Sequence, residues 1–267
     1  MTEIAEQRNS SSSLRKALRL LSVISENPAV PEGLALTELA KISGINKSTV
    51  LRLVSPLIDE NLIDRDRVSG KFRLGFGSLR LGQSYLDSLD LRSAANEELR
   101  ALMRETANTV HLVILSGHDV VYVDKVEDEA TVRMASRVGA TMPAYCTAVG
   151  KAIMAYSSEE VVSSILSVPL RAITPKTITD PAALRLELAA VRRRGYSIDD
   201  RENEPEVRCV AAPIFNHDDV VVAALSVSSL TSRMTPAKVR EVGPMAAVVG
   251  LRISAKLGSR RAAALTK

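Results

Sequence analysis

Four side chains with hydrogen-bond donors, two of them cationic, fall within six positions in the first fifth of the sequence. They are Lys47, Ser48, Thr49 and Arg52. Helical spacing places them on one side of a predicted helix, whose opposite side is apolar and faces a core. Lysine and arginine bind phosphates and guanine, and serine and threonine bind several base edges. We therefore predict a surface that contacts double-stranded DNA at the start of this helix.

The stretch 36–63 supplies the elements that would position these donors. Thr37 is a suitable N-cap for a first short helix, and Gly44 ends that helix because glycine readily takes the left-handed conformation at C′. Asn46 can cap the second helix. A short helix that supports a second, with donors in the first turns of the second, is the helix-turn-helix arrangement. The simpler alternative is a helical hairpin with a solvated polar face.

A basic hairpin follows the second helix. Two short extended runs meet at Ser69-Gly70, with Phe72 and Leu74 on one face, which is a hairpin signal. Four cations are available to the other face: Arg65, Arg67, Lys71 and Arg73. A basic hairpin at this place is typical of a wing that contacts phosphates or the minor groove, which favours the DNA-binding interpretation.

The second half carries weaker signals for a ligand site. Thr147 precedes a predicted helix that begins near Ala148, and a helix N-terminus favours an anion; alternatively, Thr147 only caps that helix. Ser226 and Ser228 lie two apart on a predicted strand, so they share a face that is either exposed or lines a cavity. Gly150 begins no phosphate loop, because the Walker spacing is not present.

Composition limits the class of protein. The chain has 267 residues, 46% hydrophobic, which suggests two domains, and no apolar run is long enough for a transmembrane helix. We expect a cytoplasmic protein, because the first residues have no apolar secretory segment and only two cysteines are present. The net charge of +4 is weak evidence for nucleic acid, and the absence of tryptophan argues against a platform for single strands.

The periodicity changes along the chain. Helices are predicted at 14–25, 76–90, 91–106, 159–166, 182–194 and 236–257. The runs 109–115 and 119–126 predict a hairpin, 130–138 a third strand, and 208–215 and 220–228 two more strands. Strands interleaved with helices predict a mixed α/β domain after the DNA-binding part.

Six segments together resemble the isocitrate lyase regulator (IclR) family of bacterial transcription factors. They are LRKAL, LTELAKISGINKSTVLRLV, GKFRLG, YCTAVGKAIMA, GYSIDDRENEPEVRCVAAPIF and VAALSVS. The resemblance spans about Ser13 to Leu257. It departs from the family pattern at Glu206, where glycine is usual, and at Pro56, which we expect to kink the second helix beyond its base-reading turn.

The resemblance implies an α+β protein in five parts. These are a disordered tail (1–12), a winged helix-turn-helix domain (13–75), a linker helix (76–91), a GAF-like effector-binding domain (92–258) and a basic tail (259–267). It implies a repressor or activator that binds an operator and a small metabolite, an organic acid or a related compound, as a homodimer or homotetramer. No cofactor, metal, catalytic residue or membrane contact is expected.

Combined with the resemblance, the residues above give a predicted effector site. It comprises Met134, Tyr145, Cys146, Thr147, Ala148, Val149, Asp199, Cys209, Ser226 and Ser228. Asp199 matches a family acid that faces the effector, and we expect it to accept a hydrogen bond from a ligand hydroxyl and not to face a carboxylate, since like charges repel.

Two other interpretations remain at this point. The C-terminal domain could be an enzyme that uses Cys146 or His111, or it could only assemble the oligomer. Neither cysteine has a local catalytic signature, and no Cys-x-x-Cys or His-x-x-x-His spacing supports a zinc site with His111. Cys146 and Cys209 are more typical of small buried apolar residues.

Overall fold

The computed structural model describes the chain except residues 1–11, 28–31, 88–89, 128–135 and 262–267. The chain divides into two compact units, residues 1–88 and 89–267. The first unit has four helices and a two-stranded sheet, and the second is built on a six-stranded sheet, counted over the described residues. The architecture is the α+β arrangement expected from the sequence.

Three helices form the core of the first unit. They are α1 (Ser12–Glu26), α2 (Leu36–Ser43) and α3 (Lys47–Asp59), and each contacts the other two. Leu20, Ile24, Leu39, Val50 and Val54 are buried between them. The apolar stripe of α3 therefore faces inward, which turns the polar side of its first turns toward solvent. The helix continues through Pro56 to Asp59.

Local signals at the turn between α2 and α3 set the orientation of α3. Gly44 has φ of +70°, and the Asn46 side chain accepts a hydrogen bond of 2.9 Å from the Thr49 N–H, both as predicted. The prediction that Thr37 caps α2 is wrong. The N-cap is Ala35, and its N–H donates to Glu38 Oε2 at 2.8 Å, so a carboxylate at the third helical position satisfies this end of the helix.

The hairpin after α3 consists of β1 (Ile63–Arg65) and β2 (Phe72–Leu74), antiparallel with Ile63 opposite Leu74. Phe72 is buried in the helical core, whereas Leu74 is 38% exposed. The Asp66 carboxylate accepts hydrogen bonds from the backbone of Val68 and Ser69, which shapes the turn. Helix α4 (Phe76–Asp87) then ends the unit.

The sheet of the second unit is antiparallel throughout, with the order β5-β4-β3-β8-β7-β6. Its strands are β3 (Thr109–Ser116), β4 (Asp119–Val126), β5 (Thr141–Pro143), β6 (Ser197–Asp200), β7 (Val207–Phe215) and β8 (Val221–Leu230). A bulge between Leu112 and Val113 shifts the pairing of β3 with β4. This shift changes which side chains of β4 stand beside those of β3.

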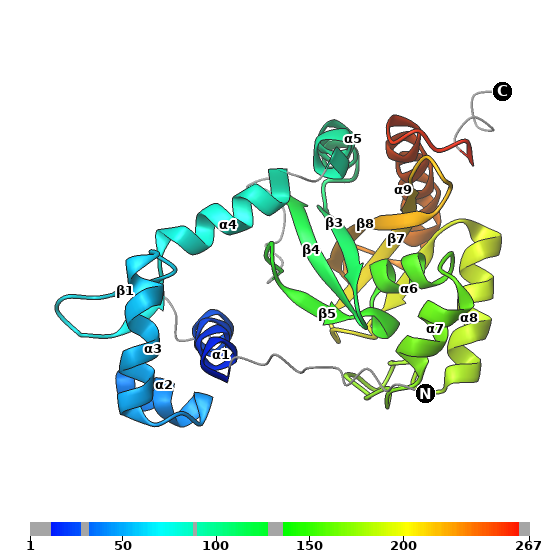
Figure 1. The fold of residues 1–267 in the computed structure, drawn as a ribbon. Coiled ribbons are helices and arrows are strands. Elements are labelled where there is room, and N and C mark those ends of the chain that lie inside the picture. The colour runs from blue at the N-terminus through cyan, green and yellow to red at the C-terminus, as the bar shows by residue number, and fades with distance from the viewer. Residues whose placement is uncertain (1–11, 28–31, 88–89, 128–135, 262–267) are drawn as a thin grey trace, which may run out of the picture. The chain divides into compact units, whose positions relative to one another are not determined.

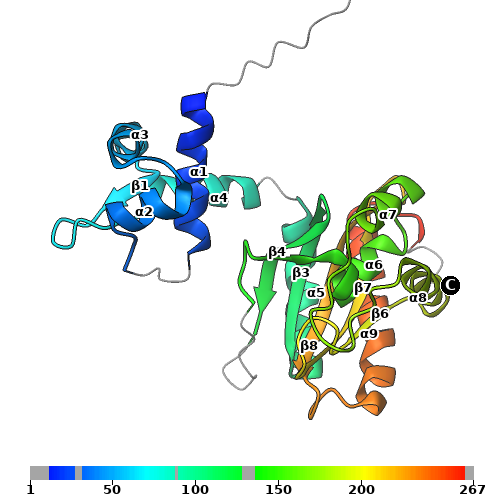
Figure 2. The same cartoon turned by 90° about the horizontal axis from the view of Figure 1, so that it is seen from below.

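Helices cover both faces of the sheet (Figures 1 and 2). On one face, α5 (Asp90–Thr106) packs on β3 and α9 (Pro236–Lys256) packs on β7, and the two helices contact each other. On the other face, the 3-10 turn η1 (Ala144–Cys146) leads into α6 (Ala148–Met154), which packs on β7 and β8. Helices α7 (Glu159–Leu166) and α8 (Pro181–Arg194) complete that layer, where Ile153, Ile165 and Leu184 share one core.

The predicted elements agree with the structure at most places. Both hairpin strands of 109–126, the strands near 208–228 and the helices near 159, 182 and 236 are present, and Gly195 ends α8 with φ of +81°. The sequence did not predict β5, which has only three residues. Of the predicted strand 130–138, residues 130–135 lie outside the described residues, and Ser136 to Val138 are not in a strand. No helix that the structure describes is long and apolar enough to span a membrane.

Candidate functional site

The start of α3 presents the predicted DNA-contacting side chains to solvent. Lys47, Ser48 and Arg52 are exposed and Thr49 is half-buried. The Ser48 hydroxyl donates to Asn46 Oδ1 at 3.0 Å. Lys47 and Arg52 form no ion pair or hydrogen bond with the part of the chain that the structure describes, so both charges are available to a partner.

The wing cations are less free than the sequence suggested. Arg73 forms an ion pair with Asp64 at 2.7 Å, and Lys71 forms one with Glu32 at 3.1 Å. The Arg65 guanidinium lies 5.3 Å from the centre of the Phe72 ring and donates to the Gly70 carbonyl. Arg67, in the turn, is exposed and has no partner among the described residues. Of the four wing cations, Arg67 is therefore the one most available to a phosphate.

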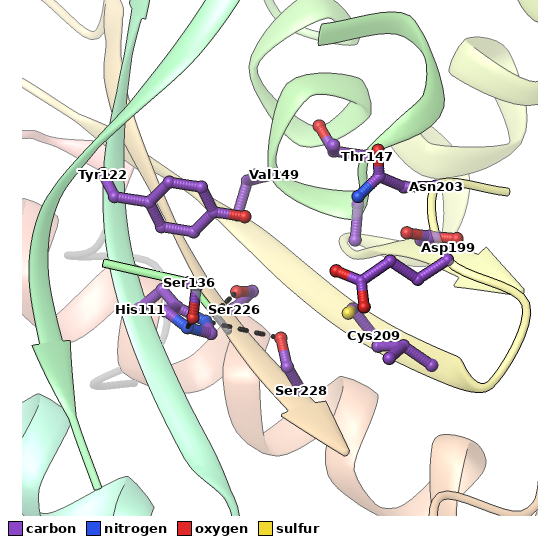
Figure 3. A pocket seen from close by; sticks show the side chains of 13 residues that line it. His111, Tyr122, Ser136, Thr147, Val149, Asp199, Asn203, Cys209, Ser226 and Ser228 are labelled. Carbon is purple, nitrogen blue, oxygen red and sulfur yellow. Dashed lines mark hydrogen bonds between the residues drawn. The ribbon is translucent and has the colours of Figure 1, made fainter. Parts of the chain in front are cut away.

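In the second unit, polar side chains from five strands converge on the α6 side of the sheet. The pairing sets this row: Asp199 on β6 is opposite Cys209 on β7, Cys209 is opposite Ser228 on β8, and Ser226 is opposite His111 on β3. Figure 3 shows these side chains together with Tyr122 of β4 around one pocket. The cavity that these side chains line has a volume of about 30 Å³, and the wider space around it, open solvent included, is about 440 Å³.

His111 is at the centre of this wall. Its Nδ1 lies 3.4 Å from both the Ser226 and the Ser228 hydroxyls, and its Nε2 lies 2.7 Å from the Ser136 hydroxyl. Its ring makes an edge contact with Tyr122, with centroids 5.1 Å apart. Burial, with a contribution from the Lys125 charge, lowers the pKa of His111 to about 3, so the imidazole is neutral at pH 7.

Asp199 lies at the opposite side of the pocket and is almost fully buried. Its Oδ1 accepts a hydrogen bond of 2.7 Å from the Glu202 N–H. Burial raises the pKa of Asp199 to about 7, and the Glu202 N–H and the Lys151 charge oppose this rise. The carboxyl therefore keeps its proton to a much higher pH than an ordinary aspartate, and in that form it can donate to a ligand as well as accept.

Helix α6 forms the other wall, through Thr147, Ala148 and Val149. The Thr147 hydroxyl accepts a hydrogen bond of 3.1 Å from the Gly150 N–H, so this side chain caps the helix, as the simpler alternative stated. The helix has only seven residues. We therefore assign no anion site to its N-terminus.

The pocket contains seven of the ten predicted effector-site residues: Thr147, Ala148, Val149, Asp199, Cys209, Ser226 and Ser228. Met134 lies outside the described residues. Tyr145 and Cys146 are not in the lining: the Tyr145 hydroxyl donates to the Arg171 carbonyl, and Cys146 is buried in the core beneath α6. Glu206, where the family usually has glycine, is exposed and does not line the pocket.

Sequence reasoning missed six lining residues: His111, Tyr122, Ser136, Asn203, Glu204 and Val207. His111, which the sequence suggested only as a catalytic or zinc-binding residue, and Tyr122 lie in runs predicted as strands. The available signal was that each polar residue lies between apolar neighbours in the sequence. This signal identifies pocket residues only when the strand register shows which side chains share a face. Asn203 and Glu204 lie in the acidic stretch that follows β6.

Cysteine chemistry is not supported at this site. Burial raises the pKa of Cys146 to about 12, and its Sγ lies near the Pro143 carbonyl and Asn203 Oδ1, both at 3.7 Å. Burial also raises the pKa of Cys209. A thiol that stays protonated is a poor nucleophile. Within the described ranges, no group of three His, Cys, Asp or Glu side chains is arranged to hold a metal ion.

Comparisons with known proteins agree with both units. Residues 13–67 match the model of the IclR helix-turn-helix domain, and residues 83–255 match that of the bacterial transcriptional regulator IclR C-terminal domain. The chain is 36% identical to the HTH-type transcriptional regulator XynR of Escherichia coli over 92% of this chain and 97% of the relative.

Solved structures give the same result. An IclR transcriptional regulator from Alicyclobacillus acidocaldarius superposes with a TM-score of 0.81 at 30% identity, covering 92% of this chain and 98% of that one. An IclR homologue from Microbacterium hydrocarbonoxydans, complexed with 4-hydroxybenzoate, superposes with a TM-score of 0.79 at 25% identity and the same coverage of each chain.

Proposed function

Because the chain belongs to the IclR family of bacterial transcriptional regulators, we propose that its pocket binds a small metabolite and that this binding changes its affinity for an operator. The protein is a DNA-binding regulator with a C-terminal effector-binding domain, and its homologues are regulators and not enzymes. Three points are proposed: where the effector binds, which functional groups it carries, and how its binding affects DNA affinity.

One observation carries the assignment of the pocket. Side chains with hydrogen-bonding groups from five different strands point into the same pocket. Several of them alternate along their strands with fully buried apolar residues, so these polar groups are turned inward and away from bulk solvent. Burying polar groups is unfavourable unless they find partners. The Ser226 and Ser228 hydroxyls each lie 3.4 Å from Nδ1 of His111, which is long for a hydrogen bond and leaves these groups able to bind a ligand.

The lining favours a ligand that carries hydroxyl or ketone oxygens. Ser226, Ser228, Tyr122 and Asn203 supply donors, and the acids are Asp199 and Glu204. No lysine or arginine lines the pocket among the described residues. If the effector is an organic acid, its carboxylate therefore lies away from Asp199, and a hydroxyl lies beside it. 4-Hydroxybenzoate, bound by the Microbacterium homologue, has both groups and is a reasonable first probe.

DNA recognition is assigned to the first turns of α3 and to the wing. Lys47, Ser48, Thr49 and Arg52 contact bases or adjacent phosphates, and Arg67 contacts a phosphate, with Arg65, Lys71 and Arg73 contributing where their internal pairs allow. We propose a homodimer or homotetramer, so that two reading heads bind an operator with two-fold symmetry.

A thermal-shift screen with a metabolite library, followed by electrophoretic mobility shifts with promoter DNA, tests this function. A compound that raises the melting temperature and also changes DNA affinity supports it. If no compound changes DNA affinity, including those that bind in this pocket, the alternative holds. The C-terminal domain then only assembles the oligomer.

A further inference from the structure

The two walls of the pocket are joined by one buried ion pair. One wall is the start of α6, and the other is the end of β6 with the turn after it, which supply Asp199, Asn203 and Glu204. Lys151, on α6, donates from Nζ to Oε1 of Glu202, in the middle of that turn. Lys151 is fully buried and Glu202 is 6% exposed. Neither residue lines the pocket itself.

This pair is poorly explained as a source of stability. Removing two charges from water costs several kcal/mol for each ion, and apolar residues of similar volume often stabilise a fold equally well. In addition, Oε2 of Glu202 has no hydrogen-bond partner among the described residues, which adds to the cost of burial. The pair is therefore better explained by the geometry that it imposes.

The turn that carries Glu202 is fixed in a strained conformation. Arg201 has φ of +67°, which is unfavourable for a residue with a side chain. Thr174 Oγ1 donates to the Arg201 carbonyl and Thr177 Oγ1 donates to the Glu202 carbonyl, both at 2.6 Å. These two hydrogen bonds fix the backbone of the turn to the segment between α7 and α8. The Glu202 side chain joins the turn to α6 through Lys151.

We propose that the Lys151–Glu202 pair is a spacer that sets the width of the pocket, so that both are positioning residues for the effector. The Nζ–Oε1 bond fixes the separation between α6, with Ala148 and Val149, and the turn, with Asn203 and Glu204. A role of this pair in regulation rests on the proposed function, whereas its control of the width of the pocket does not. The size of ligand that fits is determined by this pair, although it touches no ligand.

Cys209 provides a probe of pocket width that needs no effector. Its half-buried thiol lines the pocket, whereas Cys146 is buried in the core. Alkylation of Cys209 is followed by mass spectrometry with iodoacetamide and the larger N-ethylmaleimide. In Lys151→Met we expect about tenfold faster alkylation, with a greater gain for N-ethylmaleimide, because a buried tie is lost. The Lys151 charge lowers the pKa of Cys209, so its loss alone would slow the reaction.

The double variant Lys151→Met/Glu202→Met separates positioning from stability. It removes both charges together, so its melting temperature should recover toward the wild-type value. If the pair positions the turn, Cys209 still reacts faster than in the wild type, because the hydrogen bond from Lys151 to Glu202 no longer joins the walls. Lys238→Met, which removes an exposed pair with Glu241 on α9, is the matched control and should react as the wild type does.

Wild-type alkylation rates in the double variant would overturn the proposal, whether or not Lys151→Met folds. An equal increase of the Cys209 alkylation rate in the Lys238→Met control would also overturn it, since such an increase would indicate that the whole domain had become more dynamic. Failure of the metabolite screen would leave these rates unchanged, so the spacer and the proposed effector function fail independently.

Discussion

His111 on β3 and Ser228 on β8 meet inside the pocket, where Nδ1 of the histidine lies 3.4 Å from the serine hydroxyl. The imidazole is neutral at pH 7 because burial lowers its pKa to about 3. A neutral ring can donate from one nitrogen and accept at the other, so this pair can bind a ligand oxygen without a formal charge. We therefore expect a ligand to be recognised at this wall through hydrogen bonds and not through a cation.

His111 and Asp199 should give opposite pH dependences of stability. The folded state holds a proton on Asp199 up to pH about 7, whereas the ordinary pKa is 3.8, so this group makes the free energy of unfolding fall as the pH rises from 4 to 7. His111, with an ordinary pKa of 6.5, binds its proton only in the unfolded state between pH 3 and 6.5. It therefore makes the free energy of unfolding rise with pH over that window.

Urea unfolding of Asp199→Asn and His111→Gln between pH 5 and 6.5 tests these signs. Relative to the wild type, Asp199→Asn should become more stable as the pH rises, and His111→Gln less stable, each by at most about 1.4 kcal/mol per pH unit. Parallel pH profiles for the two variants and the wild type would show that neither group titrates as the burial predicts.

Gly150→Ala should strongly destabilise the second unit. A Cβ at Gly150 would lie 2.0 Å from the Ala144 carbonyl oxygen, so η1 and α6 could not keep their approach. We expect a loss of about 3 kcal/mol or more, because backbone must move. Gly82→Ala on α4 is the control: its Cβ meets nothing within 4 Å, and helix propensity predicts about 0.5–1 kcal/mol of stabilisation. Equal melting temperatures for the two variants would contradict the packing of η1 on α6.

The parts of the fold that sequence predicted are those set by local chemistry. Asn46 caps α3 and Gly44 and Gly195 end helices, because the relevant contacts lie within four residues. Thr37 was wrong for a local reason as well: Glu38 satisfies an earlier N-terminus at Ala35. The three-residue strand β5 is too short to give a periodic signal.

The pocket was predicted less well because it depends on strand register. Ser226 and Ser228 could be paired from their spacing, but the residues opposite them, His111 and Cys209, are more than 15 positions away in the sequence. Tyr145 precedes Thr147 by two residues, yet the 3-10 turn directs it into the core instead of the pocket. A single sequence contains no direct signal for such long-range pairing.

Arg52→Ala should change the sequence preference of DNA binding. If Arg52 makes a bidentate base contact, the variant loses about 1–3 kcal/mol on the operator and little on unrelated DNA. Arg67→Ala should weaken binding to both alike and lower the salt slope by about one unit, as expected for a phosphate contact. Lys71→Ala should act in the same way but less strongly, because Glu32 already neutralises part of its charge.

Fluorescence anisotropy on operator and unrelated duplexes at several salt concentrations measures both effects. Arg104→Ala, at an exposed position of α5 in the second unit, is the control and should match the wild type. Wild-type affinity and salt dependence for Arg52→Ala and Arg67→Ala would remove the support for this DNA-contacting surface.

The operator should be a near-palindrome. Two reading heads related by two-fold symmetry require half-site centres about 34–36 Å apart, one helical turn, or a multiple of that distance. Footprinting on the native promoter measures this spacing, and a tetramer would protect two such elements. Protection of one asymmetric half-site by a single subunit would exclude the proposed dimer.

The most direct test measures DNA affinity against ligand concentration in the wild type and in Ser226→Ala/Ser228→Ala. A compound taken from the thermal-shift screen is titrated into each protein bound to labelled operator. We predict that the compound changes the wild-type dissociation constant, because it must bind one state better than the other. The double variant should bind unliganded DNA normally and no longer respond to the compound. An undiminished response of the double variant would mean that the effector binds elsewhere and that this pocket is not the effector site.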